Sequence, residues 1–238
     1  MKTNGNLMAV MALAGVIQGA LASDISGKVT LKGTPPPETP IAFEQTCGKL
    51  TAAPVTTRRY QVGEGGGLAN VFVYVKTGLE GKKFEAKGEP PLLDQVNCMY
   101  EPYVMGVMTN QIFNVRNSDP VMHNVHPTPK PGSANKEFNL GQPTKGQVNP
   151  KSFPNPEVLV RFKCDVHQWM FAYVGVLEHP YFAVTDKNGE FKLPSGLPAG
   201  TYTIEAFHQK TGATGAMTQE IKVGESDMKS LNFTIEVK

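Results

Sequence analysis

Residues 164–170 read Cys-Asp-Val-His-Gln-Trp-Met and follow a mainly apolar run at 158–162 that is typical of a β-strand. Three metal-binding side chains therefore fall on one short loop, namely those of Cys164, His167 and Met170. Thiolate, imidazole and a weak thioether are the donors of mononuclear copper sites. Zinc also binds Cys and His, but Met is a poor zinc ligand, because zinc usually takes Cys, His or carboxylate. This stretch predicts a copper site that lacks only a second imidazole.

A second imidazole is available upstream, where residues 122–126 read Met-His-Asn-Val-His. Taken one at a time, such residues are more often structural, because a buried Cys behaves as a small apolar side chain and Met fills gaps in cores. Four suitable donors on two loops favour metal binding over that alternative. The ligands that we expect for a type 1 copper ion are His123, Cys164, His167 and Met170.

The remainder of the chain predicts an all-β protein. Short runs rich in β-branched and aromatic residues recur, long helical periodicities are absent, and 24 Gly and 19 Pro residues supply turn signals. Segment 127–156 is rich in Pro, Asn, Gly and Lys, and we expect it to form a loop around the periphery of the site. Strands are expected at 25–32, 68–75, 92–96, 104–108, 112–116, 158–163, 172–177, 182–185, 191–193, 201–207 and 220–223.

The segment from Leu92 to Val176 resembles a cupredoxin of the amicyanin or plastocyanin type, on the C-x-x-H-x-x-M loop and the M-H-N-V-H run. The resemblance implies a Greek-key sandwich in which His123 is the first copper ligand and Asn124 fixes the loop that follows it. It also implies that His126 is a neighbour of the site rather than a ligand. The imidazole of His167 would be partly exposed as the edge for electron transfer, with Trp169 and Phe171 as an apolar contact patch around it.

Nearly the whole chain resembles bacterial periplasmic proteins of the methylamine-utilisation type, in which a carboxypeptidase-regulatory-like (transthyretin-like) module follows a cupredoxin-like segment. The runs that carry this resemblance are 117–119, 180–186 and 197–202. The module lacks its first strands there, and the runs at 25–32 and 71–75 look like the missing pair. The expected division is a signal peptide at 1–22, N-terminal strands and loop at 23–85 that complete the C-terminal sandwich, a copper domain at 86–177 and the regulatory-like sandwich at 178–238.

The first 22 residues carry an early Lys2, an apolar run at 7–17 and an Ala-Leu-Ala pattern at 20–22. These features predict a secretory signal peptide and a periplasmic or otherwise exported protein. The apolar run is too short for a membrane span, so no integral membrane span is expected in the mature chain.

The chain has three cysteines, and Cys164 is assigned to the metal. An oxidising compartment permits the other two, Cys47 and Cys98, to form a disulfide, which is the pairing that we expect. The alternative is that both are free and buried.

A type 1 site filled by protein donors leaves no open position for substrate, so the sequence predicts a carrier of single electrons rather than an enzyme. A cytochrome, an oxidase or a dehydrogenase is the expected redox partner. Two alternatives remain open, a periplasmic copper carrier or store and a structural subunit of an envelope or respiratory complex. The charge is nearly balanced, with 23 Lys and Arg against 21 Asp and Glu, so nucleic acid is not an expected partner.

Overall fold

The computed structural model describes residues 23–237, so the expected signal peptide at 1–22 lies outside the described residues. Nearly all regular structure in this range is β-strand, and the all-β prediction is confirmed. The exceptions are one helical turn, α1 (Gln45–Gly48), and two 3-10 turns, η1 (Glu64–Gly66) and η2 (Ala213–Gly215). Among these residues, no helix is long and apolar enough to cross a membrane.

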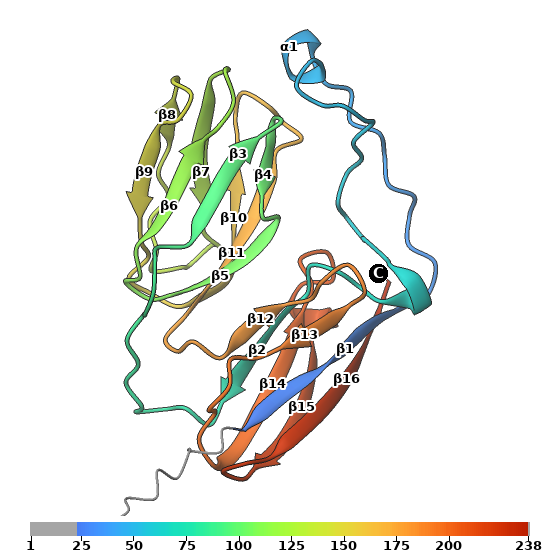
Figure 1. Ribbon diagram of the computed structural model, residues 1–238, viewed down its shortest axis with the longest axis vertical. Helices are drawn as coiled ribbons and strands as arrows, with labels where there is room; N and C mark the ends of the chain where they lie inside the picture. The colour runs from blue at the N-terminus through green and yellow to red at the C-terminus, as the bar shows by residue number, and fades with distance from the viewer. Residues whose placement is uncertain (1–22, 238) are drawn as a thin grey trace, which may run out of the picture.

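The middle of the chain forms a two-sheet β-sandwich, here called sandwich A, at the upper left of Figure 1. One sheet has the strand order β5-β11-β10-β7-β8 and the other β4-β3-β6-β9. Its strands are β3 (Leu92–Val96), β4 (Met99–Glu101), β5 (Val104–Met108), β6 (Phe113–Asn117), β7 (His123–Thr128), β8 (Leu140–Gln142), β9 (Val148–Lys151), β10 (Glu157–Lys163) and β11 (Phe171–Leu177). Alternate residues of β6 point inward, and Phe113 packs with Phe153 and Phe162 between the sheets.

The two ends of the chain combine into a second sandwich, here called sandwich B, in the lower half of Figure 1. Strand β1 (Asp24–Lys32) pairs in parallel with β16 (Met228–Glu236) and antiparallel with β13 (Glu190–Lys192). The facing sheet has the order β12-β2-β14-β15, and Ile25, Val73 and Ile204 belong to the apolar core between the sheets. The strands of this second sheet are β2 (Phe72–Thr77), β12 (Phe182–Val184), β14 (Gly200–Phe207) and β15 (Met217–Val223).

The two sandwiches pack against each other through two glycines. Gly106 and Gly175 are paired across the β5–β11 ladder, so this part of the sheet of sandwich A has no side chains on its surface. A Cβ atom on Gly175 would lie 2.3 Å from the ring of Phe72, and one on Gly106 would lie 2.4 Å from the ring of Phe182. Only glycine allows these rings to approach so closely, so the contact between the sandwiches depends on both positions.

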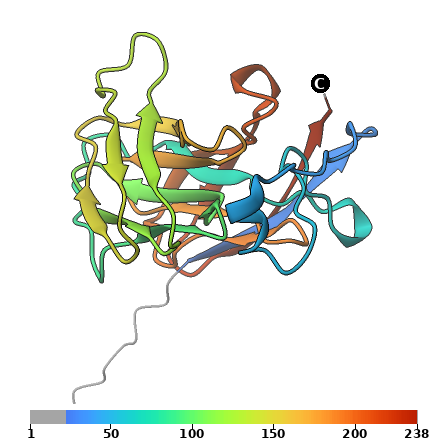
Figure 2. The ribbon, with the colours of Figure 1, turned by 90° about the horizontal axis from the view of Figure 1, so that it is seen from above.

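Residues 38–60, here called the strap, leave sandwich B after β1 and cross to the end of sandwich A, where α1 lies in Figures 1 and 2. The strap is closed at its base because the carboxylate of Glu38 accepts hydrogen bonds from the Thr57 hydroxyl at 2.5 Å and the Tyr60 amide at 2.6 Å. At its tip, Cys47 forms a disulfide with Cys98 of sandwich A, with a Cα–Cα distance of 5.7 Å. The disulfide prediction is confirmed, and both cysteines are fully buried.

Candidate metal centre

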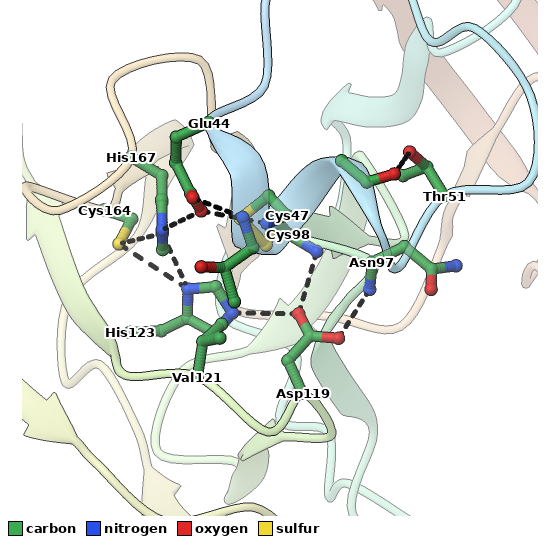
Figure 3. Close-up of a disulfide and its surroundings, with 12 residues drawn as sticks. Glu44, Cys47, Thr51, Asn97, Cys98, Asp119, Val121, His123, Cys164 and His167 are labelled. Atoms are coloured by element: carbon green, nitrogen blue, oxygen red, sulfur yellow. Dashed lines mark hydrogen bonds and ion pairs between the residues drawn. A yellow bond between two sulfur atoms is a disulfide. The ribbon is translucent and has the colours of Figure 1, made fainter.

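Strand pairing brings the predicted ligands together at one end of sandwich A. Strand β7 runs antiparallel to β10 with Lys163 opposite His126, so His123 at the start of β7 lies beside Cys164, which follows β10. The loop from β10 to β11 then turns back and carries His167 to the same point. The Nδ1 atoms of His123 and His167 are 3.0 Å apart, and the Cys164 sulfur lies 3.9 Å and 3.7 Å from them (Figure 3).

These three atoms are spaced to hold one metal ion. A triangle with sides of 3.0, 3.9 and 3.7 Å has its centre about 2.1 Å from each corner, close to the ~2.0–2.3 Å of metal–nitrogen and metal–thiolate bonds. The exposed fractions of His123, Cys164 and His167 are 0, 2 and 4%. The structure therefore contains a buried, trigonal group of two imidazoles and one thiol that fits a metal ion.

Met170 closes the ligand loop. Its amide donates to the His167 carbonyl at 3.0 Å, and its carbonyl accepts from the Cys164 amide at 3.2 Å. The side chain is fully buried in the same apolar cluster that contains Cys164. The structure thus places Met170 beside the three-atom group, and the axial role of its sulfur stays a prediction.

Asp119 orients the first imidazole. Its carboxylate accepts from His123 Nε2 at 2.9 Å and from the amides of Asn97 and Cys98 at 2.7 and 2.8 Å. Burial alone would raise the pKa of Asp119, but these hydrogen bonds hold it below its ordinary value. A carboxylate beside Nε2 favours the proton on that nitrogen and leaves the Nδ1 lone pair toward Cys164 and His167, which is how carboxylates commonly support metal-binding histidines.

Asn124 ties the two ligand loops together. The side-chain Oδ1 of Asn124 accepts hydrogen bonds from the Asp165 backbone amide at 2.7 Å and from the Cys164 thiol at 3.3 Å. The backbone amide of Asn124 donates to the same sulfur at 3.5 Å. Burial raises the pKa of Cys164, but the contacts of its sulfur with the His123 and His167 imidazoles and with the Asn124 backbone amide outweigh burial and lower this pKa to about 6. The sulfur is therefore prepared to bind metal as a thiolate.

His126 lies outside this group. Its Nδ1 contacts the Asp165 carboxylate at 2.6 Å, and its Nε2 contacts the carboxylate of Glu137. The side chain joins three surface segments and does not face the Cys164 sulfur. That His126 is a neighbour of the site rather than a ligand stays a prediction.

The expectation that His167 forms an exposed edge is wrong. The strap covers this imidazole, and Glu44 Oε1 lies 3.8 Å from its Nε2 (Figure 3). The Trp169 ring lies 5.2 Å from the His167 ring, and Phe43 of the strap packs edge-on against the same indole at 5.2 Å. The Trp169 indole N–H donates to the Cys98 carbonyl at 3.0 Å, so on the side that faces His167 this residue is part of the cover.

Sequence reasoning missed two contributors to the site, Asp119 and Glu44. A carboxylate four residues before the first histidine is a weak signal by itself. A strap residue that reaches His167 could have been suspected from the Cys47–Cys98 pairing, because that disulfide draws the residues around Cys47 to the end of sandwich A. No spacing in the sequence indicates which strap side chain would face the imidazole.

No family model matches this chain, and no curated protein matches it. Parts of its fold are similar to solved copper proteins. A copper-containing nitrite reductase from Thermus scotoductus has a TM-score of 0.35 and 15% identity, over 43% of this chain and 25% of that chain. A purple cupredoxin from Nitrosopumilus maritimus has a TM-score of 0.31 and 18% identity, over 36% of this chain and 98% of that chain. An oxidised amicyanin variant has a TM-score of 0.33 and 19% identity, over 44% of this chain and 97% of that chain. Each similarity covers less than half of this chain, so the proposals below rest on the site itself.

Proposed function

We propose that this protein binds one copper ion through His123, Cys164 and His167, with Met170 as a weak axial ligand, and that it carries single electrons. The observation that supports this most directly is the buried triangle of two Nδ1 atoms and one sulfur. A trigonal set of two imidazoles and a thiolate beside a thioether is the donor set of electron-transfer copper sites. A structural zinc site would instead need four strong ligands in a tetrahedron.

Copper bound there would take up and release one electron, and the residues of the chain would keep the site rigid and dry. Asp119 fixes the proton of His123 on Nε2, and Asn124 holds the two loops at a constant separation. The strap and the apolar cluster around Met170 exclude water. Because His123, Cys164 and His167 are buried, we propose a carrier rather than an enzyme. The same enclosure disfavours the alternative of a copper donor, which must release its metal.

The strand pairing also supports a proposal for the organisation of the chain. We propose a copper domain at 86–177 inserted into a transthyretin-like sandwich made of 23–85 and 178–238, since β1 and β2 pair with strands from the C-terminal part. The expected signal peptide supports export, and an exported redox protein would be the partner.

The test is the spectrum of the copper-loaded protein. We expect one copper ion per chain and an intense visible band from thiolate-to-copper charge transfer, with the narrow hyperfine splitting of a type 1 centre in electron paramagnetic resonance. Cys164→Ser should abolish the band, whereas His126→Ala, outside the triangle, should keep it. A wild-type protein that binds Cu(II) without this band would refute the proposal.

A further inference from the structure

The cover over His167 changes where an electron can enter. The Nε2 atom of this imidazole faces Glu44 and lies in one group with the Cys47–Cys98 disulfide, so a partner cannot touch it while the strap is in place. Trp169 is the aromatic side chain that packs on His167 and also reaches an open cavity. Trp169 is half-buried, so a route through aromatic contacts from His167 toward solvent runs by way of the indole.

The cavity beside Trp169 has a volume of about 300 Å³ and lies between the strap, sandwich A and the loop after β14. Its walls include the rings of Tyr103 and Phe171. The guanidinium of Arg58 lies over Tyr103 and that of Arg161 lies over Phe171, each 4.3 Å from the ring centre. Aromatic rings and flat cations thus surround the outer side of the indole.

The cavity carries uncompensated positive charge. Arg58 is paired with Glu101 at 2.6 Å, but within residues 23–237 the side chains of Arg59, Arg161 and Lys210 form no ion pair. Burial lowers the pKa of Lys210, and repulsion by Arg59 and Arg161 lowers it further, while Glu38 opposes this change. Glu38 itself is occupied at the base of the strap. An incoming anion would therefore find three cations that lack a carboxylate partner.

We propose that this cavity is the docking pocket for an acidic redox protein, which inserts a carboxylate among Arg59, Arg161 and Lys210 and exchanges one electron with the copper site past Trp169. The partner loses one electron as the site gains it, or the reverse, and no bond forms or breaks. This inference rests on the proposed electron-carrier function.

A protein fits these observations better than a small molecule. The volume is at the lower end of the roughly 300–1,000 Å³ of pockets for drug-sized ligands. Arg59 on the strap and Lys210 after β14 are both exposed, so the charge continues from the cavity onto the surrounding surface. A broad acidic surface can contact both cations while one of its side chains enters the cavity. Such charges at the edge of an interface mainly raise the association rate.

The first test needs no copper. Trp169 is the only tryptophan of the chain, so its fluorescence in the apo protein reports on this cavity. We expect iodide to quench it several-fold more strongly than caesium, and Arg59→Glu/Lys210→Glu to remove that preference. The control Lys87→Glu/Lys145→Glu makes the same change in net charge at two exposed residues that do not line the cavity, and it should keep the preference. Equal quenching of the wild type by both ions would overturn the pocket and leave the copper proposal untouched.

The second test uses the copper protein with an acidic and a basic cytochrome c of similar potential, in stopped flow at low ionic strength. Electrostatic steering changes association rates by about 10–1,000-fold, so we expect the acidic cytochrome to react at least about tenfold faster and the Arg59→Glu/Lys210→Glu variant to reverse this order. The visible band of each variant shows whether its copper site is intact. The same experiment compares hexacyanoferrate(III) with a cationic cobalt complex. If the protein reacts faster with the anionic complex but equally fast with both cytochromes, the cavity binds a small anion and protein docking is overturned. Failure to develop the visible band at all would instead refute the proposed function.

Discussion

At the scale of single residues, the site depends on side chains that never touch the metal position. Asp119 is 3% exposed and contacts His123 on the side away from Cys164. Its charge is stabilised by the Asn97 and Cys98 amides, so the same two residues that fix the carboxylate connect it to the disulfide. Affinity for the proposed copper ion should therefore respond to changes one step removed from the proposed ligands.

Asp119→Asn should weaken copper binding by about 10–100-fold, the usual cost of losing a residue that orients a metal-binding histidine. The amide has no negative charge to hold the proton on His123 Nε2, and its NH₂ group cannot accept a hydrogen bond in place of the oxygen that it replaces. Competition with a chelator of known affinity measures the change. Glu137→Gln, a carboxylate exchange at His126, is the matched control, and an equal loss in both variants would contradict the role of Asp119.

His208 predicts a pH dependence of stability. Burial lowers its pKa to about 4, helped by Lys210 and opposed by Glu38. Between about pH 4 and about pH 6.5 the unfolded chain binds a proton at His208 that the folded chain does not bind. The free energy of unfolding therefore rises with pH through this window, and the contribution of His208 is lost as the pH falls toward about 4. Urea unfolding of the apo protein should show that His208→Gln removes up to about 3 kcal/mol of this pH dependence. Parallel curves for wild type and variant between pH 4 and pH 7 would show that the imidazole does not titrate abnormally.

At the scale of elements, the strap shows how a segment with little regular structure can control a site. It consists of α1 and extended chain, and its position is set by the Cys47–Cys98 disulfide at the tip and by Glu38 at the base. The pairing of Phe43 with Trp169 adds an aromatic contact near the tip. Removing the disulfide should therefore free the tip while the base stays closed.

Cys47→Ser/Cys98→Ser should lower the free energy of unfolding by up to about 4 kcal/mol, because the disulfide closes a loop with a sequence separation of 51. The double change is needed because a single one leaves a thiol that could pair with Cys164. We also expect His167 to become accessible to diethyl pyrocarbonate in the apo protein, as mapped by mass spectrometry. Modification that stays as slow as in the wild type would mean that the strap is held by its other contacts.

At the scale of the whole molecule, the paired glycines decide how the two sandwiches meet. Gly175→Ala should destabilise the protein by about 1–3 kcal/mol, the usual cost of overpacking, because the new Cβ would overlap the Phe72 ring. Gly141→Ala, whose Cβ would lie 3.5 Å from the end of the Met122 side chain, is the control and should be nearly neutral. Denaturant unfolding measures both. Equal stability of the two variants would indicate that sandwich A can shift away from sandwich B at no cost.

The sequence predicts local features of this molecule better than distant ones. Cys164 and His167 could be paired as ligands because they lie three residues apart on a loop whose conformation is nearly set by its length. Strands β8 and β9 were missed inside segment 127–156, because both are short edge strands and β9 contains Pro150. The cover over His167 could not be foreseen, since the strap has no periodicity that reveals its contacts. The cations of the cavity come from segments far apart in sequence, so no motif contains them.

The positions of the three cysteines bear on how the chain matures. Cys47 and Cys98 precede Cys164 in the chain, so during export from the N-terminus they would reach an oxidising compartment first. An oxidase that joins cysteines in their order of appearance would form the native pair directly and leave the last thiol reduced. The protein should then reach the state with a Cys47–Cys98 disulfide and a reduced Cys164 without a disulfide isomerase, because pairing the cysteines in chain order gives the native disulfide.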